Sequence, residues 1–177
     1  MNPEAYISPV RKNYSNKAIF DVIAVLVLSF FYTYWFFDDL SRQGLHCDVA
    51  LVGRAALAAL RNMPNGGELS VSILGRNFPL MLTQYNAATD IYATLPWVYL
   101  LGSKPIALSM PGFIWGFLSV ILLYITCLSL YRDRLYSLLV SSVFTTAPVF
   151  ISSSRLGVYT GNLTILFALA CTFFLFR

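Results

Sequence analysis

Four apolar runs decide which folds are open to this chain. The hydrocarbon core of a bilayer is about 30 Å thick, and about 20 helical residues are needed to cross it. Residues 18–37 form one such run, interrupted only by Asp21, and residues 106–130 form a second. A third run covers residues 135–152, and a fourth lies near residues 160–177. About 14 helical residues in the fourth run would reach only about 21 Å, so this span is either short or the start of a longer protein.

The composition agrees with a chain that lies in lipid. Hydrophobic residues make up 58% of the sequence and charged residues only 11%, whereas soluble domains carry about 25% charged residues. Helices satisfy their own backbone polar groups, which lipid requires. We therefore expect an all-α integral membrane protein with about four transmembrane helices, and with interfacial helices in a long loop after the first span.

Basic residues near the spans predict the orientation, because they are retained on the cytoplasmic side. They fall into two groups, at Arg11, Lys12, Lys17, Arg132 and Arg134. Placing both groups inside makes residues 1–17 a cytoplasmic tail and puts the long loop, residues 38–105, on the outer side. Residues 18–177 then form one transmembrane domain, which we expect in the bacterial inner membrane.

Turn residues and prolines divide the long loop into three segments. Residues 48–62 are rich in alanine and leucine and begin with an aspartate suited to a helix N-cap, so a short helix is expected. Residues 68–82 contain Gly75 and Pro79 and are expected to be irregular or briefly extended. Residues 85–102 are apolar but too short to span, which favours an interfacial or re-entrant helix.

Several classes of function are not indicated. The net charge of +4 is spread over the chain without a basic run, so we expect no nucleic-acid partner. The three cysteines, Cys47, Cys127 and Cys171, are an odd number and have neither a disulfide pattern nor zinc-finger spacing. Asn162 begins a glycosylation sequon, but it abuts the membrane and we expect no modification there.

Short motifs follow one another along the chain in a particular order. They are an acid after the first span, Tyr85-Asn86 and Tyr92 in a segment ending in Leu101-Gly102, Met110-Pro111, Gly116, Tyr124, a basic turn, Ala147-Pro148 and Ser154-Arg155. This order resembles the N-terminal part of the GT-C glycosyltransferases, in the protein-mannosyltransferase and lipid A aminoarabinose-transferase branch. The resemblance covers roughly residues 48–176. It implies a polytopic enzyme that transfers a sugar from a polyprenyl-phosphate donor to an acceptor on the extracytoplasmic side.

The resemblance also implies which residues form the site. By position, Asp48 corresponds to the acid that acts as a base or helps to hold a divalent metal ion in that family. A carboxylate near the acceptor hydroxyl can accept its proton, while a cation stabilises the leaving phosphate. Arg155 would contact the lipid phosphate. The pocket would be lined by Tyr85, Asn86, Asp90 and Tyr92.

Three positions depart from the pattern of the family. Val49 stands where a second acid often follows, Ala88 where a lipid-phosphate-binding lysine is common in one branch, and Thr160 where an aspartate often follows the Ser-Arg pair. Each departure removes a charged partner of the reaction. A second function therefore stays open, namely a non-catalytic subunit that keeps the GT-C scaffold and packs against other membrane subunits.

The candidate residues also have simpler interpretations. Asp48 could serve only as a helix N-cap, a role worth about 1 kcal/mol. Arg155 could extend to lipid head groups, and Asp90 could be a solvated interfacial acid. Asp38 and Asp39 directly follow the first span, so we expect them to be a solvated helix end.

Overall fold

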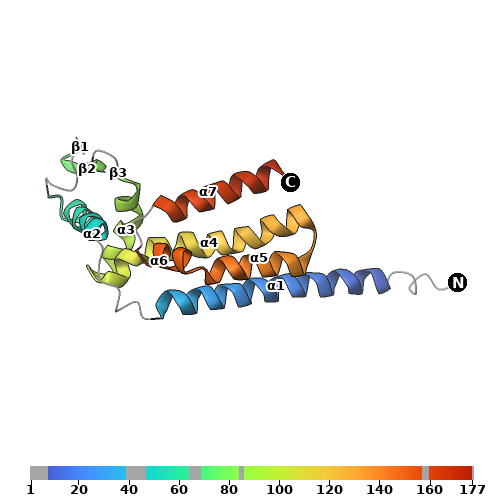
Figure 1. The fold of residues 1–177 in the computed structure, drawn as a ribbon. Coiled ribbons are helices and arrows are strands. Elements are labelled where there is room, and N and C mark those ends of the chain that lie inside the picture. The colour runs from blue at the N-terminus through green and yellow to red at the C-terminus, as the bar shows by residue number, and fades with distance from the viewer. Residues whose placement is uncertain (1–7, 39–46, 64–68, 84–85, 157–159, 177) are drawn as a thin grey trace.

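Five helices lie side by side and the long loop folds at one end of them (Figure 1). The structure is a computed structural model and describes residues 8–38, 47–63, 69–83, 86–156 and 160–176. The bundle consists of α1 (Ser8–Phe37), α4 (Pro105–Tyr131), α5 (Arg134–Thr146), α6 (Pro148–Leu156) and α7 (Thr160–Leu175). We call the end that carries the long loop the loop end. The opposite end, where α4 turns into α5, is the turn end.

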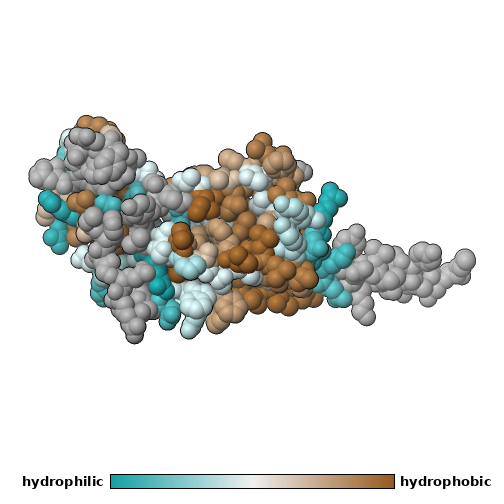
Figure 2. All heavy atoms as spheres, in the orientation of Figure 1, coloured by the Kyte–Doolittle hydropathy of each residue, from teal (hydrophilic) through white to brown (hydrophobic). Residues whose placement is uncertain are grey.

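Two of these helices are long and apolar enough to cross a membrane. They are the part of α1 from Asn16 to Phe37 and the whole of α4. The number rises to three if α5 and α6, which meet at an angle of 56°, count as one broken span. Figure 2 shows hydrophobic residues over the middle of the bundle and hydrophilic residues at its two ends. A membrane protein is therefore supported with two or three candidate spans. The fourth span that we expected is not confirmed, because α7 has only 16 residues.

The third apolar run is not the continuous helix that its sequence predicts. Pro148 has no backbone N–H to bond a carbonyl of α5, and its ring clashes with the preceding turn, which favours a break at this point. The Ala147 N–H instead bonds the Phe144 carbonyl, and the chain restarts as α6. The Thr146 hydroxyl donates to the Ser142 carbonyl at 2.9 Å, which satisfies one acceptor near the break. The span thus has a bend with polar backbone atoms close to the loop end.

Aromatic side chains of α1 and α4 form the centre of the bundle. Tyr32 and Phe36 are fully buried, and the ring of Tyr32 stacks on that of Phe113 with 5.7 Å between centroids. Phe150 of α6 completes the cluster from the other side. Since these residues come from three helices, their packing fixes α6 against the end of α1.

A charged cluster joins α1 to the beginning of α5. The Arg134 guanidinium donates to both carboxylate oxygens of Asp21, from Nε at 2.9 Å and from Nη2 at 3.1 Å. The Tyr124 hydroxyl donates to the same carboxylate at 2.9 Å. Asp133 caps α5 by accepting the N–H groups of the following turn. Asp21, which interrupts the first apolar run, is therefore paired within the bundle.

The helices α2 (Cys47–Leu60) and α3 (Thr89–Leu101) of the long loop pack on each other through an apolar cluster. Val52 and Ala56 of α2 meet Ile91 and Val98 of α3, and Leu108 at the start of α4 joins them. Both helices occur where the sequence indicates helices. Their position at a membrane interface stays a prediction, because their described buried side chains face each other and α4.

The segment between these helices forms a small sheet. Its strands are β1 (Leu69–Ile73), β2 (Arg76–Thr83) and β3 (Asn86–Ala87), in the order β1-β2-β3. β1 and β2 are antiparallel and joined by the two-residue turn Leu74-Gly75, in which both residues have positive φ. The sequence predicts an irregular or only briefly extended segment here. The structure instead has a three-stranded sheet, because the pairing between strands outweighs the interruption by Pro79.

Leu74 occupies a turn position that suits asparagine better than leucine. Its φ is +52°, in the left-handed region, and its side chain is 99% exposed. The side chain therefore makes no contacts that would offset the free-energy cost of this backbone conformation. We expect Leu74→Asn to stabilise the β1–β2 hairpin by about 1 kcal/mol, because asparagine tolerates this conformation. Hydrogen exchange of the β1 and β2 amides measures the effect. The control Leu69→Asn makes the same chemical change on an exposed strand residue and should weaken protection; faster exchange in Leu74→Asn would contradict the prediction.

Candidate functional site

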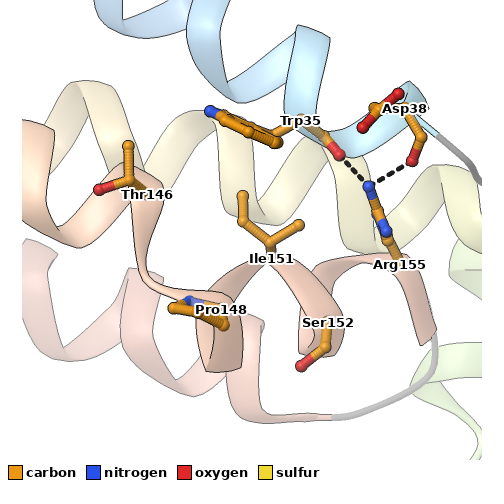
Figure 3. A pocket seen from close by; sticks show the side chains of 7 residues that line it. All are labelled: Trp35, Asp38, Thr146, Pro148, Ile151, Ser152 and Arg155. Atoms are coloured by element: carbon orange, nitrogen blue, oxygen red, sulfur yellow. Dashed lines mark hydrogen bonds between the residues drawn. The ribbon is translucent and has the colours of Figure 1, made fainter.

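A pocket opens at the loop end between α1 and the broken span. Its volume is about 490 Å³. It is lined by Trp35 and Asp38 from the end of α1, by Thr146 and Pro148 at the break, and by Ile151, Ser152 and Arg155 of α6 (Figure 3). The bend of the third span creates this space, because a straight helix would carry Ile151 and Arg155 in another direction.

Arg155 is the cation of the pocket, and α6 presents it to the last turn of α1. Its Nε donates to the Phe36 carbonyl at 3.2 Å, and its Nη2 donates to the carbonyls of Trp35 and Asp38 (Figure 3). The last carbonyls of a helix have no partner within the helix and carry partial negative charge, so a guanidinium stabilises them. Nη1 bonds no group in the described part of the chain, which leaves two of the five N–H donors for a ligand.

Asp38 brings a carboxylate to the same pocket. Its backbone carbonyl accepts from Arg155, and Figure 3 shows both residues at the same end of the cavity. The side chain is exposed, as expected of a helix end. We had assigned Asp38 no functional role. The sequence does contain a signal for this position, because Asp38 ends the first span at the same end of the bundle at which Arg155 ends the third.

The remaining walls of the pocket are mostly apolar. The ring of Trp35 and the side chains of Pro148 and Ile151 face the cavity (Figure 3). The hydroxyls of Thr146 and Ser152 are turned to their own helices, since they donate to the Ser142 and Val149 carbonyls. One cation, one carboxylate and apolar walls at the end of a span suit an amphiphile with an anionic head group.

A buried polar network holds α6 in the position that presents Arg155. Asn162 of α7 is 1% exposed and donates to the Ser154 hydroxyl at 3.0 Å, while its carbonyl oxygen accepts from Ser153 at 3.1 Å. The Tyr32 hydroxyl lies beside the Gly112 and Phe113 carbonyls of α4. The amide of Asn162 is therefore enclosed and bonded on both its oxygen and its nitrogen.

Asp48, Asp90 and Tyr92, which the sequence also suggested, do not line this pocket. Asp48 lies in the first turn of α2 and is half-buried. Tyr92 donates to the Pro79 carbonyl at 2.8 Å and so joins α3 to β2. Asn86 belongs to β3, but its side chain and all of Tyr85 lie outside the described residues.

Asp90 has an unusual electrostatic environment. It lies in the first turn of α3, and burial of its carboxyl group raises its pKa to about 6. A carboxyl with this pKa exchanges its proton close to neutral pH. Its role in lining a substrate pocket stays a prediction, and it does not belong to the residues that line the pocket of Arg155.

The resemblance allows a divalent metal ion, and the described residues show no ready-made group of ligands for one. Nowhere in residues 8–38, 47–63, 69–83, 86–156 and 160–176 do three His, Cys, Asp or Glu side chains gather as ligands. Divalent cations of this kind usually take several oxygen ligands. The metal role of Asp48 stays a prediction, and no step below uses a metal.

Comparison with known proteins adds no support to the resemblance, which therefore depends on the motifs. No protein-family model matches the chain, and searches of curated proteins and of solved structures give no significant match. The order of the motifs and the geometry of the pocket are therefore what indicate a function.

Proposed function

We propose that this chain is a GT-C-type membrane glycosyltransferase, or the N-terminal part of one, that uses a polyprenyl-phosphate sugar as donor. The observation that supports the proposal best is the pocket at the loop end, where Arg155 and Asp38 meet apolar walls. A lipid-linked phosphate has both the anionic head and the apolar tail that such a pocket suits. The acceptor would meet the donor on the extracytoplasmic side, with residues 1–17 in the cytoplasm.

Arg155 would hold the phosphate of the donor. The two donors on Nη1, which bond no group in the described part of the chain, can bond phosphate oxygens, while the other donors keep the guanidinium fixed on the end of α1. A fixed cation stabilises the negative charge that develops on the phosphate as the bond to the sugar breaks.

A carboxylate would accept the proton of the acceptor. The acceptor hydroxyl oxygen bonds the anomeric carbon of the sugar, the bond from that carbon to the phosphate oxygen breaks, and polyprenyl phosphate leaves. The proton of the hydroxyl passes to the carboxylate. Asp48 is the acid that the motifs favour and Asp38 is the acid that shares the pocket with Arg155, so both are candidates for the base.

A transfer assay with matched variants tests this proposal. We expect Asp38→Asn or Asp48→Asn to lower sugar transfer from a polyprenyl-phosphate donor by at least about 100-fold, the range of general-base catalysis. The variant that retains full turnover identifies the acid that is not the base. Ser142→Ala is the control, because the Ser142 hydroxyl donates to the Leu138 carbonyl of its own helix and the residue is not among those that line the pocket. Full turnover in both aspartate variants would overturn the proposed base chemistry.

A second function is favoured by the contacts of Arg155. Three of its donors already satisfy the end of α1, so the residue has a structural role without any ligand. This suits a non-catalytic subunit of a larger membrane complex. Absence of transfer by the folded wild-type chain, together with co-purification of other membrane subunits, would favour this function over the enzyme.

A further inference from the structure

The turn end holds an arginine whose guanidinium is only partly used. Nε and Nη2 of Arg134 donate to the two carboxylate oxygens of Asp21, which also accepts from the Tyr124 hydroxyl. Nη1 of Arg134 bonds no group in the part of the chain that the structure describes, so its two N–H donors remain for a ligand. The side chain is 33% exposed. Arg134 is therefore a cation of fixed orientation that a ligand can reach.

Further positive charge surrounds Arg134. Lys17 lies one turn before Asp21 on α1, and Arg132 follows the last residue of α4. Both side chains are exposed, and neither has an ion pair within the described residues. Asp133, the acid of the turn, already caps α5. The basic residues of this end are Arg11, Lys12, Lys17, Arg132 and Arg134, whereas its acids among the described residues are Asp21 and Asp133.

Aromatic and aliphatic side chains adjoin these cations. The rings of Tyr131 and Tyr136 meet edge to face with 4.8 Å between centroids, and both side chains are exposed. Tyrosine is enriched where a membrane meets water. Leu135 and Leu139 follow on the exposed side of α5, one turn apart. Figure 2 shows the hydrophilic turn end directly beside the hydrophobic surface of the bundle. Charge, aromatic rings and aliphatic side chains thus follow one another from the end of the bundle towards its middle.

We propose that the turn end binds the head group of an anionic phospholipid. The phosphate accepts from Nη1 of Arg134, because a guanidinium offers paired N–H donors that match phosphate oxygens. Lys17 and Arg132 attract the negative charge of the head group, and the acyl chains lie along Leu135 and Leu139. A phosphate ion without chains would use only the charged part of this surface, so the aliphatic residues favour a lipid.

This site is separate from the pocket of Arg155. The two lie at opposite ends of the bundle (Figure 1), and the turn end is the cytoplasmic end in the orientation that the basic residues predict. The cytoplasmic leaflet carries anionic lipids that attract basic segments. The site does not depend on sugar transfer, and it would serve an enzyme and a non-catalytic subunit equally.

Thermal denaturation of the full chain in a neutral detergent tests the class of ligand. A ligand that binds only the folded protein raises its melting temperature. We expect phosphatidylglycerol to raise the melting temperature of wild type in a concentration-dependent way, and phosphatidylcholine and inorganic phosphate at equal concentration to have little effect. An equal shift with phosphatidylcholine or with inorganic phosphate, or no shift with phosphatidylglycerol, would overturn the proposal.

Paired charge variants test the place of binding. Each basic residue near an anionic surface contributes about fivefold in affinity. The double variant Lys17→Gln with Arg132→Gln should therefore need about 25-fold more phosphatidylglycerol for half of the shift. Arg54→Gln with Arg61→Gln is the control, because both arginines are exposed on or next to α2 at the loop end and the same charge is removed. Equal weakening in both double variants would show that net charge matters and the turn end does not.

Photolabelling of the wild-type chain tests the site without any variant. The protein is placed in phosphatidylcholine nanodiscs that contain a small share of photoactivatable phosphatidylglycerol, and the labelled residues are mapped by mass spectrometry. We expect label within residues 131–139, and unlabelled phosphatidylglycerol should compete with it. Label that is confined to the loop end, or that unlabelled phosphatidylcholine removes equally well, would overturn the proposal.

Discussion

Replacing Gly116 by alanine is expected to destabilise the bundle strongly. A Cβ at this position would lie 2.0 Å from the Tyr32 hydroxyl oxygen and 2.8 Å from the Ser154 hydroxyl oxygen. Real side chains do not approach so closely, so Tyr32, α6 or both would have to move. Tyr32 is fully buried and its ring packs among those of Phe36, Phe113 and Phe150, which leaves it no space to rotate.

The expected loss for Gly116→Ala is about 3 kcal/mol or more, at the upper end of the cost of overpacking a core. Thermal denaturation of the detergent-solubilised protein measures it as a lower melting temperature. Because α6 carries Arg155, the pocket should also lose its shape, and any sugar transfer should fall with it.

Gly53→Ala is the matched control for this experiment. Gly53 is also a helical glycine with a close neighbour, since its Cβ would lie 2.9 Å from Cδ2 of Leu108. That atom is the far end of a flexible side chain that can turn away, and alanine favours the helix by about 1 kcal/mol. The melting temperature of Gly53→Ala should therefore stay near that of wild type. Equal melting temperatures for Gly116→Ala and wild type would show that Tyr32 and α6 are not held as described.

Breaking the ion pair between Asp21 and Arg134 is the second change with a large expected effect. Among the described residues, Arg134→Gln leaves the Asp21 carboxylate with only the Tyr124 hydroxyl, inside the apolar part of α1. Removing one partner of a buried pair costs about 3–5 kcal/mol, because the remaining charge is uncompensated. The two side chains are 33% and 26% exposed, so we reduce the expected loss to about 2–3 kcal/mol.

Unfolding of the solubilised protein by denaturing detergent measures this loss. Arg132→Gln is the control, because it removes the same charge from the same turn and Arg132 has no ion pair in the described structure. The double variant Asp21→Asn with Arg134→Gln should recover part of the stability, since both charges are then absent. Equal loss for Arg132→Gln and Arg134→Gln would show that charge in the turn matters and the pairing with Asp21 does not.

The local elements of the fold follow from local signals. Long apolar runs predict α1 and α4, and the alanine-rich segment after Asp48 predicts α2, because helix formation depends on neighbours within a few residues. Pro148 was also visible in the sequence. Its effect was not predicted, because proline occurs in transmembrane helices that continue past it, and neighbouring helices decide whether the span breaks.

The candidate site was harder to predict because its residues come from separate helices. Arg155 was identified from a motif, but its place against the carbonyls of Trp35 and Phe36 depends on how α6 packs on α1. Asp38 shares a pocket with Arg155 for the same reason. The sequence favours Asp48 over Asp38 as the catalytic residue, because the order of the motifs does not show which acid lies at the end of the broken span.

The sequence alone determined that this is a mainly helical membrane protein, because burial of apolar side chains in lipid depends on composition and run length. Only the tertiary structure decided that Asp21 pairs with Arg134, that Gly116 makes room for Tyr32, and that a pocket opens at the break before Pro148. These features depend on contacts between residues about 80 to 120 positions apart. Such contacts arise from the crossing of whole helices, and no local pattern specifies where helices cross.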